Sequence, residues 1–371
     1  MKDRIQHVLA FLAVLGLLYL FLVSIGLVGA AFKLAGKEAA RQVFGFASNP
    51  LTGLFIGILA TSLVQSSSTT TSIVVGLVAG GMPVDTAIPM IMGANIGTSV
   101  TNTLVSLGHI SRTNEFERAF AASTVHDFFN LLAVLVLFPL QYFTGFLGHL
   151  AGGLAGLVTG GADLHFHSPL KAAVKPAVKF LIHTLGTPFD SRVLHVVAAL
   201  VVAGVLLFFS LKYMTAVLRG VVMEKASGFF ERTVFRNAPL AFVVGIALTV
   251  AVQSSSITTS VVVPLAGAGI LTLSQIYPFT LGANVGTTVT AILASLAVSE
   301  HFTAAVTVAL SHLLFNVCGI GAITVVPAVR RIPMRLARSL AAQAARRRWV
   351  PFLYVLVVFF LVPLALILLT R

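Results

Sequence analysis

The sequence predicts an all-α integral membrane protein made of two inverted repeats, each with a re-entrant helical hairpin and a broken transmembrane helix. Three observations lead to this prediction. Of the 371 residues, 57% are hydrophobic and only 9% are charged. Several apolar stretches reach the roughly 20 residues that a helix needs to cross a bilayer. The quartet Gln-Ser-Ser-Ser occurs twice, at 65–68 and 253–256, in apolar surroundings where polar side chains are costly.

An internal duplication accounts for the paired quartets. Shifting the chain by 188 residues aligns His7 with His195 and Gln65 with Gln253. With small gaps, the run Gly93–Thr98 matches Gly282–Thr287, and the pair His126 and Asn130 matches His312 and Asn316. Each unit therefore covers roughly 135 residues, about 7–141 and 195–328.

Both units predict the same order of elements. A membrane helix (8–32; 195–218) leads into a charged linker (33–49; 219–237). Two apolar segments (51–64 and 69–80; 239–252 and 257–270) meet at the Gln-Ser-Ser-Ser corner. At about 1.5 Å per residue each is too short to cross, which favours a re-entrant hairpin. The next segment (86–108; 277–298) carries Gly-Ala-Asn-x-Gly-Thr, which favours an unwound break, although its glycines also fit helix contacts. A closing helix follows (116–140; 302–328).

Each unit is expected to cross the membrane three times. If the connector does not cross it, the second unit is therefore inverted relative to the first. We therefore divide the chain into a first transport repeat (1–141), a connector (142–194), a second repeat (195–328) and a C-terminal part (329–371). The C-terminal part holds seven arginines between 330 and 348 with no acidic residue among them. The positive-inside bias makes this segment a cytoplasmic loop rather than a nucleic-acid surface, and places the connector outside. We expect a multi-pass protein of the plasma membrane.

Basic residues are missing where the polar corners lie. No Lys or Arg occurs between Gln42 and Ser111, or between Asn237 and Val329. An anion bound there would depend on helix N-termini, backbone N–H groups and hydroxyls. The predicted anion-binding residues are the two corners: Gln65, Ser66, Ser67, Ser68, Gln253, Ser254, Ser255 and Ser256.

A bound anion in an apolar environment also needs a counterion. Oxygen atoms from amides, hydroxyls and freed carbonyls suit a hard monovalent cation such as sodium. The predicted sodium ligands are Gln65, Thr69, Thr70, Asn95 and Thr98 in the first unit, and Gln253, Thr258, Thr259, Asn284 and Thr287 in the second. Cys318 is the only cysteine, so the sequence predicts no disulfide and no cysteine-based metal site, and sodium is the only metal expected.

Five segments carry a family resemblance: Val64–Val75, Ile91–Thr103, Arg118–Asn130, Gln253–Ser256 and Leu281–Thr288. They resemble the type II sodium-dependent phosphate cotransporters, and in length the chain resembles the compact bacterial members, for which the membrane is the inner membrane. The resemblance implies uptake of inorganic phosphate driven by sodium, with no cofactor apart from the co-transported ion. It also implies an acidic residue in the first repeat that bears on electrogenicity, for which Asp85 and Asp127 are candidates. From the paired corners and the missing basic residues we infer a symporter that works by alternating access.

Other interpretations remain open at this stage. Membrane threonines and serines such as Thr101 often only permit close packing. The spacing of His126 and Asn130 favours hydrogen bonding between helices over contact with a proton or substrate. A serine hydrolase using Ser66–Ser68 with His126 and Asp127 is disfavoured, because adjacent residues point about 100° apart on a helix. A passive anion channel is also disfavoured, and a sodium-coupled transporter of another oxyanion or a carboxylate is the main alternative.

Overall fold

The computed structural model describes residues 2–36, 45, 49–159, 169–232, 234–298 and 300–370. Over these residues the regular elements are helices, and no strand is present. Six of the described helices are long and apolar enough to cross a membrane. The structure therefore confirms an all-α protein with several helices of membrane-spanning length.

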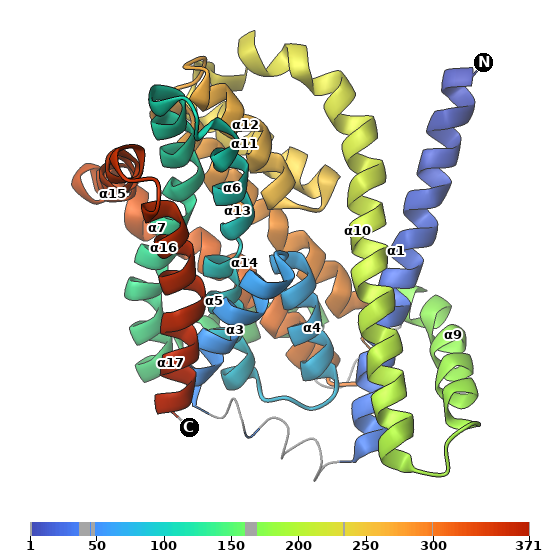
Figure 1. The fold of residues 1–371 in the computed structure, drawn as a ribbon. Coiled ribbons are helices and arrows are strands. Elements are labelled where there is room, and N and C mark those ends of the chain that lie inside the picture. Colours follow the sequence, from blue (N-terminus) through green and yellow to red (C-terminus); the bar gives the residue numbers. More distant parts are fainter. Residues whose placement is uncertain are drawn as a thin grey trace.

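The first unit begins with one long helix and continues as a series of shorter ones (Figure 1). Its elements are α1 (Lys2–Ala35), α3 (Pro50–Val64), α4 (Ser67–Ala79), α5 (Val84–Gly97), α6 (Val100–Ser106), the short turn η1 (Leu107–His109) and α7 (Thr113–Thr144). Most of the predicted linker at 33–49 lies outside the described residues.

The second unit repeats this order. Its elements are α10 (Arg192–Arg232), η2 (Val234–Arg236), α11 (Ala238–Val252), α12 (Ser255–Gly267), α13 (Leu273–Leu296) and α14 (Phe302–Thr324). Most of the linker predicted at 219–237 is helical and prolongs α10 to Arg232. At about 1.5 Å per residue, the 41 residues of α10 are much longer than a bilayer core is thick, so this helix extends beyond the membrane.

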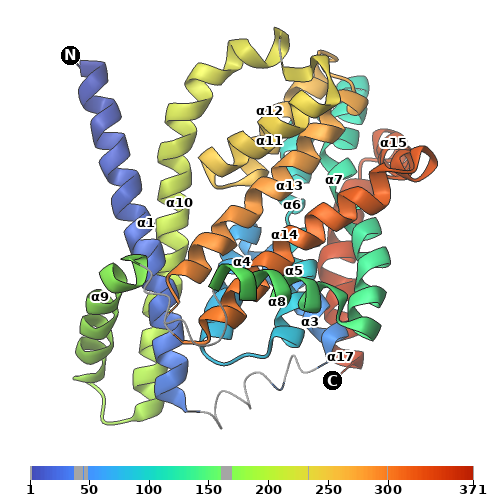
Figure 2. The ribbon, with the colours of Figure 1, turned by 180° about the vertical axis from the view of Figure 1, so that it is seen from behind.

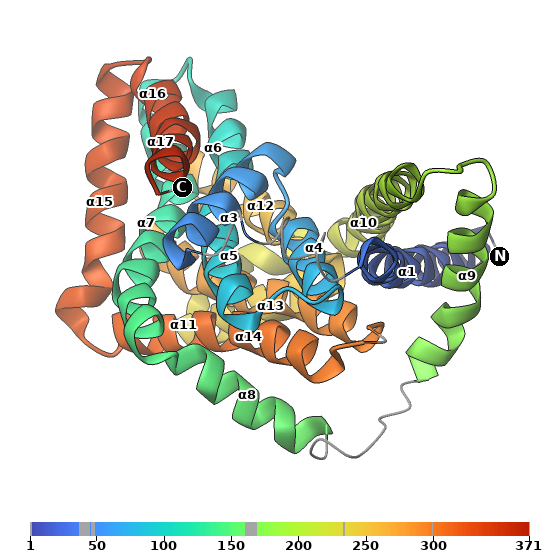
Figure 3. The ribbon, with the colours of Figure 1, turned by 90° about the horizontal axis from the view of Figure 1, so that it is seen from below.

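The remaining helices connect and flank the two units. The connector contains α8 (Phe146–Thr159) and α9 (Pro169–Gly186), and the C-terminal part contains α15 (Pro327–Arg346), α16 (Val350–Leu356), η3 (Val357–Leu361) and α17 (Val362–Leu369). Figure 2 shows α8 lying across α14, and its 14 residues are too few to span a bilayer core of about 30 Å. Seen from below, α1, α10 and α9 lie together at one side, and most of the other helices form a second group (Figure 3).

Glycines let α5 approach α3 very closely. A Cβ atom added at Gly93 would lie 1.9 Å from the carbonyl oxygen of Leu54, and one at Gly57 would lie 2.0 Å from that of Met90. The second unit has the same contact between α13 and α11, where a Cβ at Gly282 would lie 2.0 Å from the carbonyl oxygen of Phe242. Small residues thus bring two helices into backbone contact in both units.

The helix is interrupted in one unit only, and the two residues at the interruption keep right-handed backbone angles instead of unwinding. In the first unit α5 ends at Gly97 and α6 begins at Val100, with Thr98 and Ser99 between them. In the second unit α13 runs without interruption from Leu273 to Leu296, so the predicted break there is wrong. Its glycines keep helical hydrogen bonding and serve the contact with α11, which is the alternative role that the sequence left open.

The basic C-terminal helix lies against the end of α7. Ala337, Ala341 and Ala344 of α15 are buried, and Ala341 and Ala344 pack with Phe116 and Phe120 of α7. Of the seven arginines between 330 and 348, all but the partly buried Arg348 are exposed. The helix is therefore amphipathic, with an alanine face toward the protein and arginines directed away from it.

We predict that Gly93→Ala and Gly282→Ala each destabilise the protein by about 1–3 kcal/mol or more, because a methyl group at either position would overlap a neighbouring carbonyl oxygen. The thermal unfolding midpoint of purified protein measures the effect. Gly204→Ala on α10 is the control, since a Cβ there meets no atom within 4 Å. Equal midpoints for all three variants would contradict the close helix contacts.

Candidate functional site

The two Gln-Ser-Ser-Ser corners have nearly the same backbone conformation. Gln65 ends α3 with φ 56° and ψ 29°, and Gln253 ends α11 with φ 56° and ψ 26°. Ser66 and Ser254 are extended, and each caps the following helix by accepting a hydrogen bond from a backbone N–H. The left-handed backbone conformation of Gln65 and Gln253 costs a non-glycine residue about 1 kcal/mol or more. Two sequence segments 188 residues apart therefore encode one strained turn.

The start of each hairpin is also encoded locally. Asn49 caps α3 by accepting a hydrogen bond from the N–H of Leu51 at 2.9 Å, and Pro50 follows in the first turn. Asn237 caps α11 by accepting from the N–H of Leu240 at 2.8 Å, with a proline again in the first turn. Asparagine caps and early prolines favour helix starts, so each corner lies at a set distance from the start of its hairpin.

The corners converge on each other. The Ser68 hydroxyl donates to the backbone oxygen of Gln253 at 3.4 Å, and the Thr290 hydroxyl lies 3.5 Å from Ser68 Oγ. Thr290 also donates to the side-chain oxygen of Gln253 at 2.9 Å. The other serines at the helix starts, Ser67, Ser255 and Ser256, are buried as well. The structure thus brings the two predicted anion-binding segments together inside the protein.

The environments of the two glutamines differ. The Gln253 side chain is only 8% exposed, and its amide also donates to the carbonyl oxygen of Val250 at 2.6 Å. Gln65 is exposed. Thr101, which occupies in the first unit the place of Thr290 in the second, has a buried hydroxyl with no hydrogen-bond partner. One corner is therefore enclosed and bonded while its counterpart is open.

A buried network of histidines and asparagines joins the two units beside the corners. His126 of α7 bonds through Nε2 to Oδ1 of Asn284 on α13, and Asn284 donates to Asn130 at 2.8 Å. In the reverse direction, His312 of α14 lies 3.3 Å from Oδ1 of Asn95 on α5. Each histidine therefore contacts the asparagine of the other unit. This arrangement agrees with the hydrogen bonding between helices that the spacing of these residues favours.

Most predicted sodium ligands donate their hydroxyl proton within their own helix. Thr98, Thr258, Thr259 and Thr287 each donate to a carbonyl oxygen four residues earlier, at 2.7–3.0 Å. Thr70 does the same at 3.2 Å, and Thr69 donates to Ser66 Oγ at 2.8 Å. A hydroxyl that donates in this way keeps oxygen lone pairs for a cation, although one of those of Thr259 accepts a hydrogen bond from Asn102.

Several buried polar atoms near the corners and the network have no partner among the described residues. They include Asn95 Nδ2, Asn102 Oδ1, His312 Nδ1 and Asn316 Oδ1. Buried polar atoms are nearly always satisfied, so a group of exceptions calls for water or an ion. The predicted sodium ligands Asn95 and Asn284 belong to this same region, and the residue types present fit a sodium ion.

The two candidate acidic residues have different surroundings. Asp127 of α7 is fully buried and accepts a hydrogen bond from Tyr354 of α16 at 2.9 Å, whereas its Oδ1 atom has no partner. Asp85 is exposed in the first turn of α5 and lines a cavity of ≈ 460 Å³ together with His149.

Two residues at the site were not singled out from the sequence. Thr290 connects Ser68 with Gln253, and Asn102 donates to the predicted ligand Thr259 at 2.7 Å. A signal existed for Thr290, because continuing the alignment past Gly93 and Gly282 pairs it with Thr101. Nothing in the sequence indicated that Asn102 reaches the second unit.

These features define a helical multi-pass membrane protein whose duplicated polar corners face each other in its interior. The family model described as Na+/Pi-cotransporter matches residues 20–160 and 206–338, which together cover most of both units. The chain belongs to this family.

Similar proteins carry consistent names. Sodium-dependent phosphate transport protein 2A of Rattus norvegicus is 36% identical over 94% of this chain, and that of Ovis aries is 38% identical over 94%. Protein 2B of Homo sapiens is 33% identical over 97% of this chain. The chain spans 66% of the length of both 2A proteins and 65% of the 2B protein. No solved structure matches it.

We predict that Gln65→Gly raises stability by about 0.5–1 kcal/mol, because glycine adopts the left-handed conformation without steric cost and the exposed glutamine side chain packs little. Leu63→Gly, two residues earlier in regular helix, should lower stability by about 1 kcal/mol. Thermal unfolding midpoints of the two variants measure the difference. A loss in both would show that the turn at residue 65 carries no backbone strain.

Proposed function

We propose that the protein is a symporter that moves inorganic phosphate together with sodium across the plasma membrane by alternating access. Three findings support this function: membership of the Na+/Pi-cotransporter family, the names of the similar proteins, and the convergence of the two corners. The convergence is the observation that carries the proposal, because it creates one place where both repeats can hold the same solute.

The corners offer an anion two kinds of donor. The starts of α4 and α12 present N–H groups that lack helical partners, and the serines add hydroxyls. We propose Gln65, Ser66, Ser67, Ser68, Gln253, Ser254, Ser255 and Ser256 as the phosphate site. With no Lys or Arg in these stretches, the anion's charge is left to be neutralised by co-bound cations.

Sodium ions would supply the neutralising positive charge, and oxygen ligands would bind them. We propose that these ligands come from Gln65, Thr69, Thr70, Asn95, Thr98, Gln253, Thr258, Thr259, Asn284 and Thr287, and that ion binding completes the phosphate site. The partnerless amide oxygens of Asn102 and Asn316 support the proposal, because a cation or its bound water would satisfy them. The proposed order of binding is sodium first and phosphate second.

The course of the chain supports two inverted repeats. In Figure 1, α1 runs downward and α10 upward beside it, and α7 and α14 also run in opposite directions. The α3–α4 hairpin enters from the lower end of the molecule in this view, and the α11–α12 hairpin enters from the upper end. We propose that both hairpins are re-entrant, that repeats 1–141 and 195–328 are related by inversion, and that α15 lies on the cytoplasmic side.

The unequal corners support alternating access. In an inverted pair, the two repeats exchange conformations when the transporter turns from one face to the other. The bond between Thr290 and Gln253 would then open, and an equivalent bond between Thr101 and Gln65 would close. The partnerless Thr101 hydroxyl and the exposed Gln65 are the two halves of that second bond.

The contacts of the serines favour transport over hydrolysis. A serine nucleophile needs a base within hydrogen-bond reach. Among the described residues, no histidine bonds to a serine of either corner, and His126 instead contacts Ser99 at 3.0 Å. The remaining alternative is a sodium-coupled carrier of another oxyanion or a carboxylate.

Uptake into proteoliposomes tests the function. With an inward sodium gradient, we expect purified protein to accumulate radiolabelled phosphate, and choline in place of sodium should reduce uptake to background. Excess unlabelled phosphate should compete, whereas sulfate and succinate should not. If sulfate or succinate competed and unlabelled phosphate did not, the protein would be a carrier of another anion. Gln65→Gly and Gln253→Ala should abolish uptake while the protein remains folded in the membrane.

Thiol labelling tests the difference between the corners. In a Cys318→Ser background, we expect Gln65→Cys to react faster than Gln253→Cys with a hydrophilic thiol reagent in sodium-free liposomes, because Gln65 is exposed and Gln253 is enclosed. In separate samples unfolded in detergent, where both cysteines are fully accessible, the two variants should be labelled at equal rates. Equal rates in the folded protein would contradict the unequal state of the corners.

A further inference from the structure

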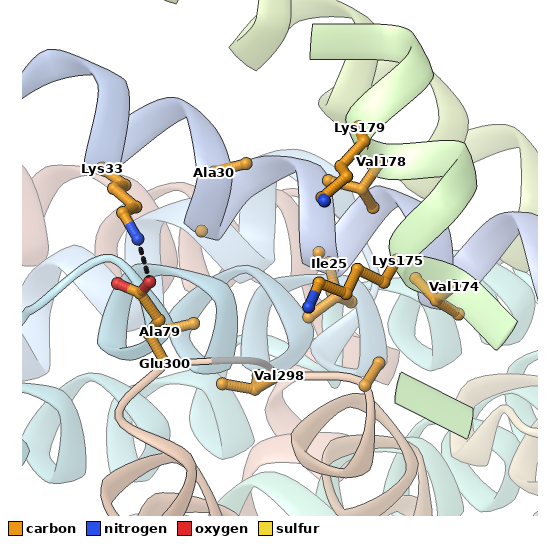
Figure 4. A pocket seen from close by; sticks show the side chains of 13 residues that line it. Ile25, Ala30, Lys33, Ala79, Val174, Lys175, Val178, Lys179, Val298 and Glu300 are labelled. Carbon is orange, nitrogen blue, oxygen red and sulfur yellow. Dashed lines mark hydrogen bonds and ion pairs between the residues drawn. The ribbon is translucent and has the colours of Figure 1, made fainter. Parts of the chain in front are cut away.

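A cavity of ≈ 280 Å³ lies away from the corners, between α1, α9 and the segment after α13 (Figure 4). Most of its lining is apolar and includes Ile25, Ala30, Val178 and Val298. Ala79 at the end of α4 also contributes, so the cavity touches both repeats and the connector.

The charged residues of this cavity leave an excess of positive charge. Lys33 pairs with Glu300 at one side, which neutralises the only carboxylate among the described residues of the lining. Lys175 and Lys179, one helical turn apart on α9, also line the cavity, and neither forms a bond or ion pair with a described residue. In Figure 4 both ammonium groups extend from α9 toward α1. Two ammonium groups without an acidic partner among the described residues therefore lie beside the apolar lining of the cavity.

The shape of the cavity follows from small residues of α1. Gly26 lets Val178 approach, since an added Cβ would lie 2.8 Å from a Val178 methyl group, and Gly29 similarly faces Ala79 at 3.3 Å. Val174 of α9 is 2% exposed against this surface, while both lysines are exposed. α9 is therefore amphipathic, with an apolar face on α1 and lysines beside it, as in helices that lie at a membrane interface.

We infer that this cavity binds the headgroup of an anionic phospholipid. Its phosphodiester would lie between Lys175 and Lys179, and the glycerol and first acyl carbons would lie along Ile25 and Val298. The cavity is too small for a whole phospholipid, so the acyl chains would remain in the bilayer. This lipid site is separate from the proposed transport site and does not depend on it.

Thermal unfolding of the full chain in detergent tests this site with three additives: phosphatidylglycerol, phosphatidylcholine with the same acyl chains, and inorganic phosphate. We expect phosphatidylglycerol to raise the unfolding midpoint by roughly 3 °C more than phosphatidylcholine does. The double variant Lys175→Gln/Lys179→Gln should lose at least half of this extra gain, although its midpoint without lipid should be unchanged because both lysines are exposed.

Two controls separate this site from general attraction to a basic protein. Lys212→Gln/Arg335→Gln removes the same charge from exposed positions outside the cavity and should keep the full gain. Ala30→Trp fills the apolar part and should lose the gain with all charges intact. Equal effects of the two lipids, or a full gain in the Lys175/Lys179 double variant, would overturn the inference. A lysine-dependent gain from inorganic phosphate would assign the lysines to a soluble anion and overturn it too.

Discussion

A helix that ends in the interior of a protein must find its hydrogen-bond partners there, and the rest of this structure depends on that constraint. α3 and α11 end, and α4 and α12 begin, in the middle of apolar sequence. Serine caps satisfy part of the backbone at each corner, and glycine contacts hold α5 and α13 tightly behind the hairpins. The corners also lie against each other, so that Ser68 contacts the backbone of Gln253 inside the protein.

The polar network extends the same logic across the two units. His126 bonds to Asn284 and His312 contacts Asn95, so the closing helix of each unit is tied to the glycine-containing helix of the other. A movement of one unit must therefore change contacts in its partner. The network is less satisfied on one side, because Asn130 bonds to Asn284 whereas Asn316 bonds only to the backbone of His312. Buried polar groups with unequal bonding are expected where ions and water come and go.

The sequence predicted the features that local chemistry controls. The apolar segments and the Gln-Ser-Ser-Ser corners each depend on a few neighbouring residues, and the structure shows helices and turns at these places. The break predicted in the second unit failed because helix propensity is a weak preference that tertiary packing can override, and α13 runs unbroken through Gly282 and Gly286. The roles of Thr290 and Asn102 could not be read from one segment, since each depends on how two distant segments dock.

The glutamines show which part of the corners is local and which is not. Their φ angles are identical, yet one side chain is enclosed and the other exposed. Local sequence therefore fixes the turn, and the arrangement of the two units decides its surroundings. Glycine would form this turn at lower cost, so backbone geometry alone does not account for an amide at both corners. Strain kept at two matched positions agrees with the proposed role of the two glutamines in binding, and their unequal surroundings agree with the proposed exchange of the repeats between two states.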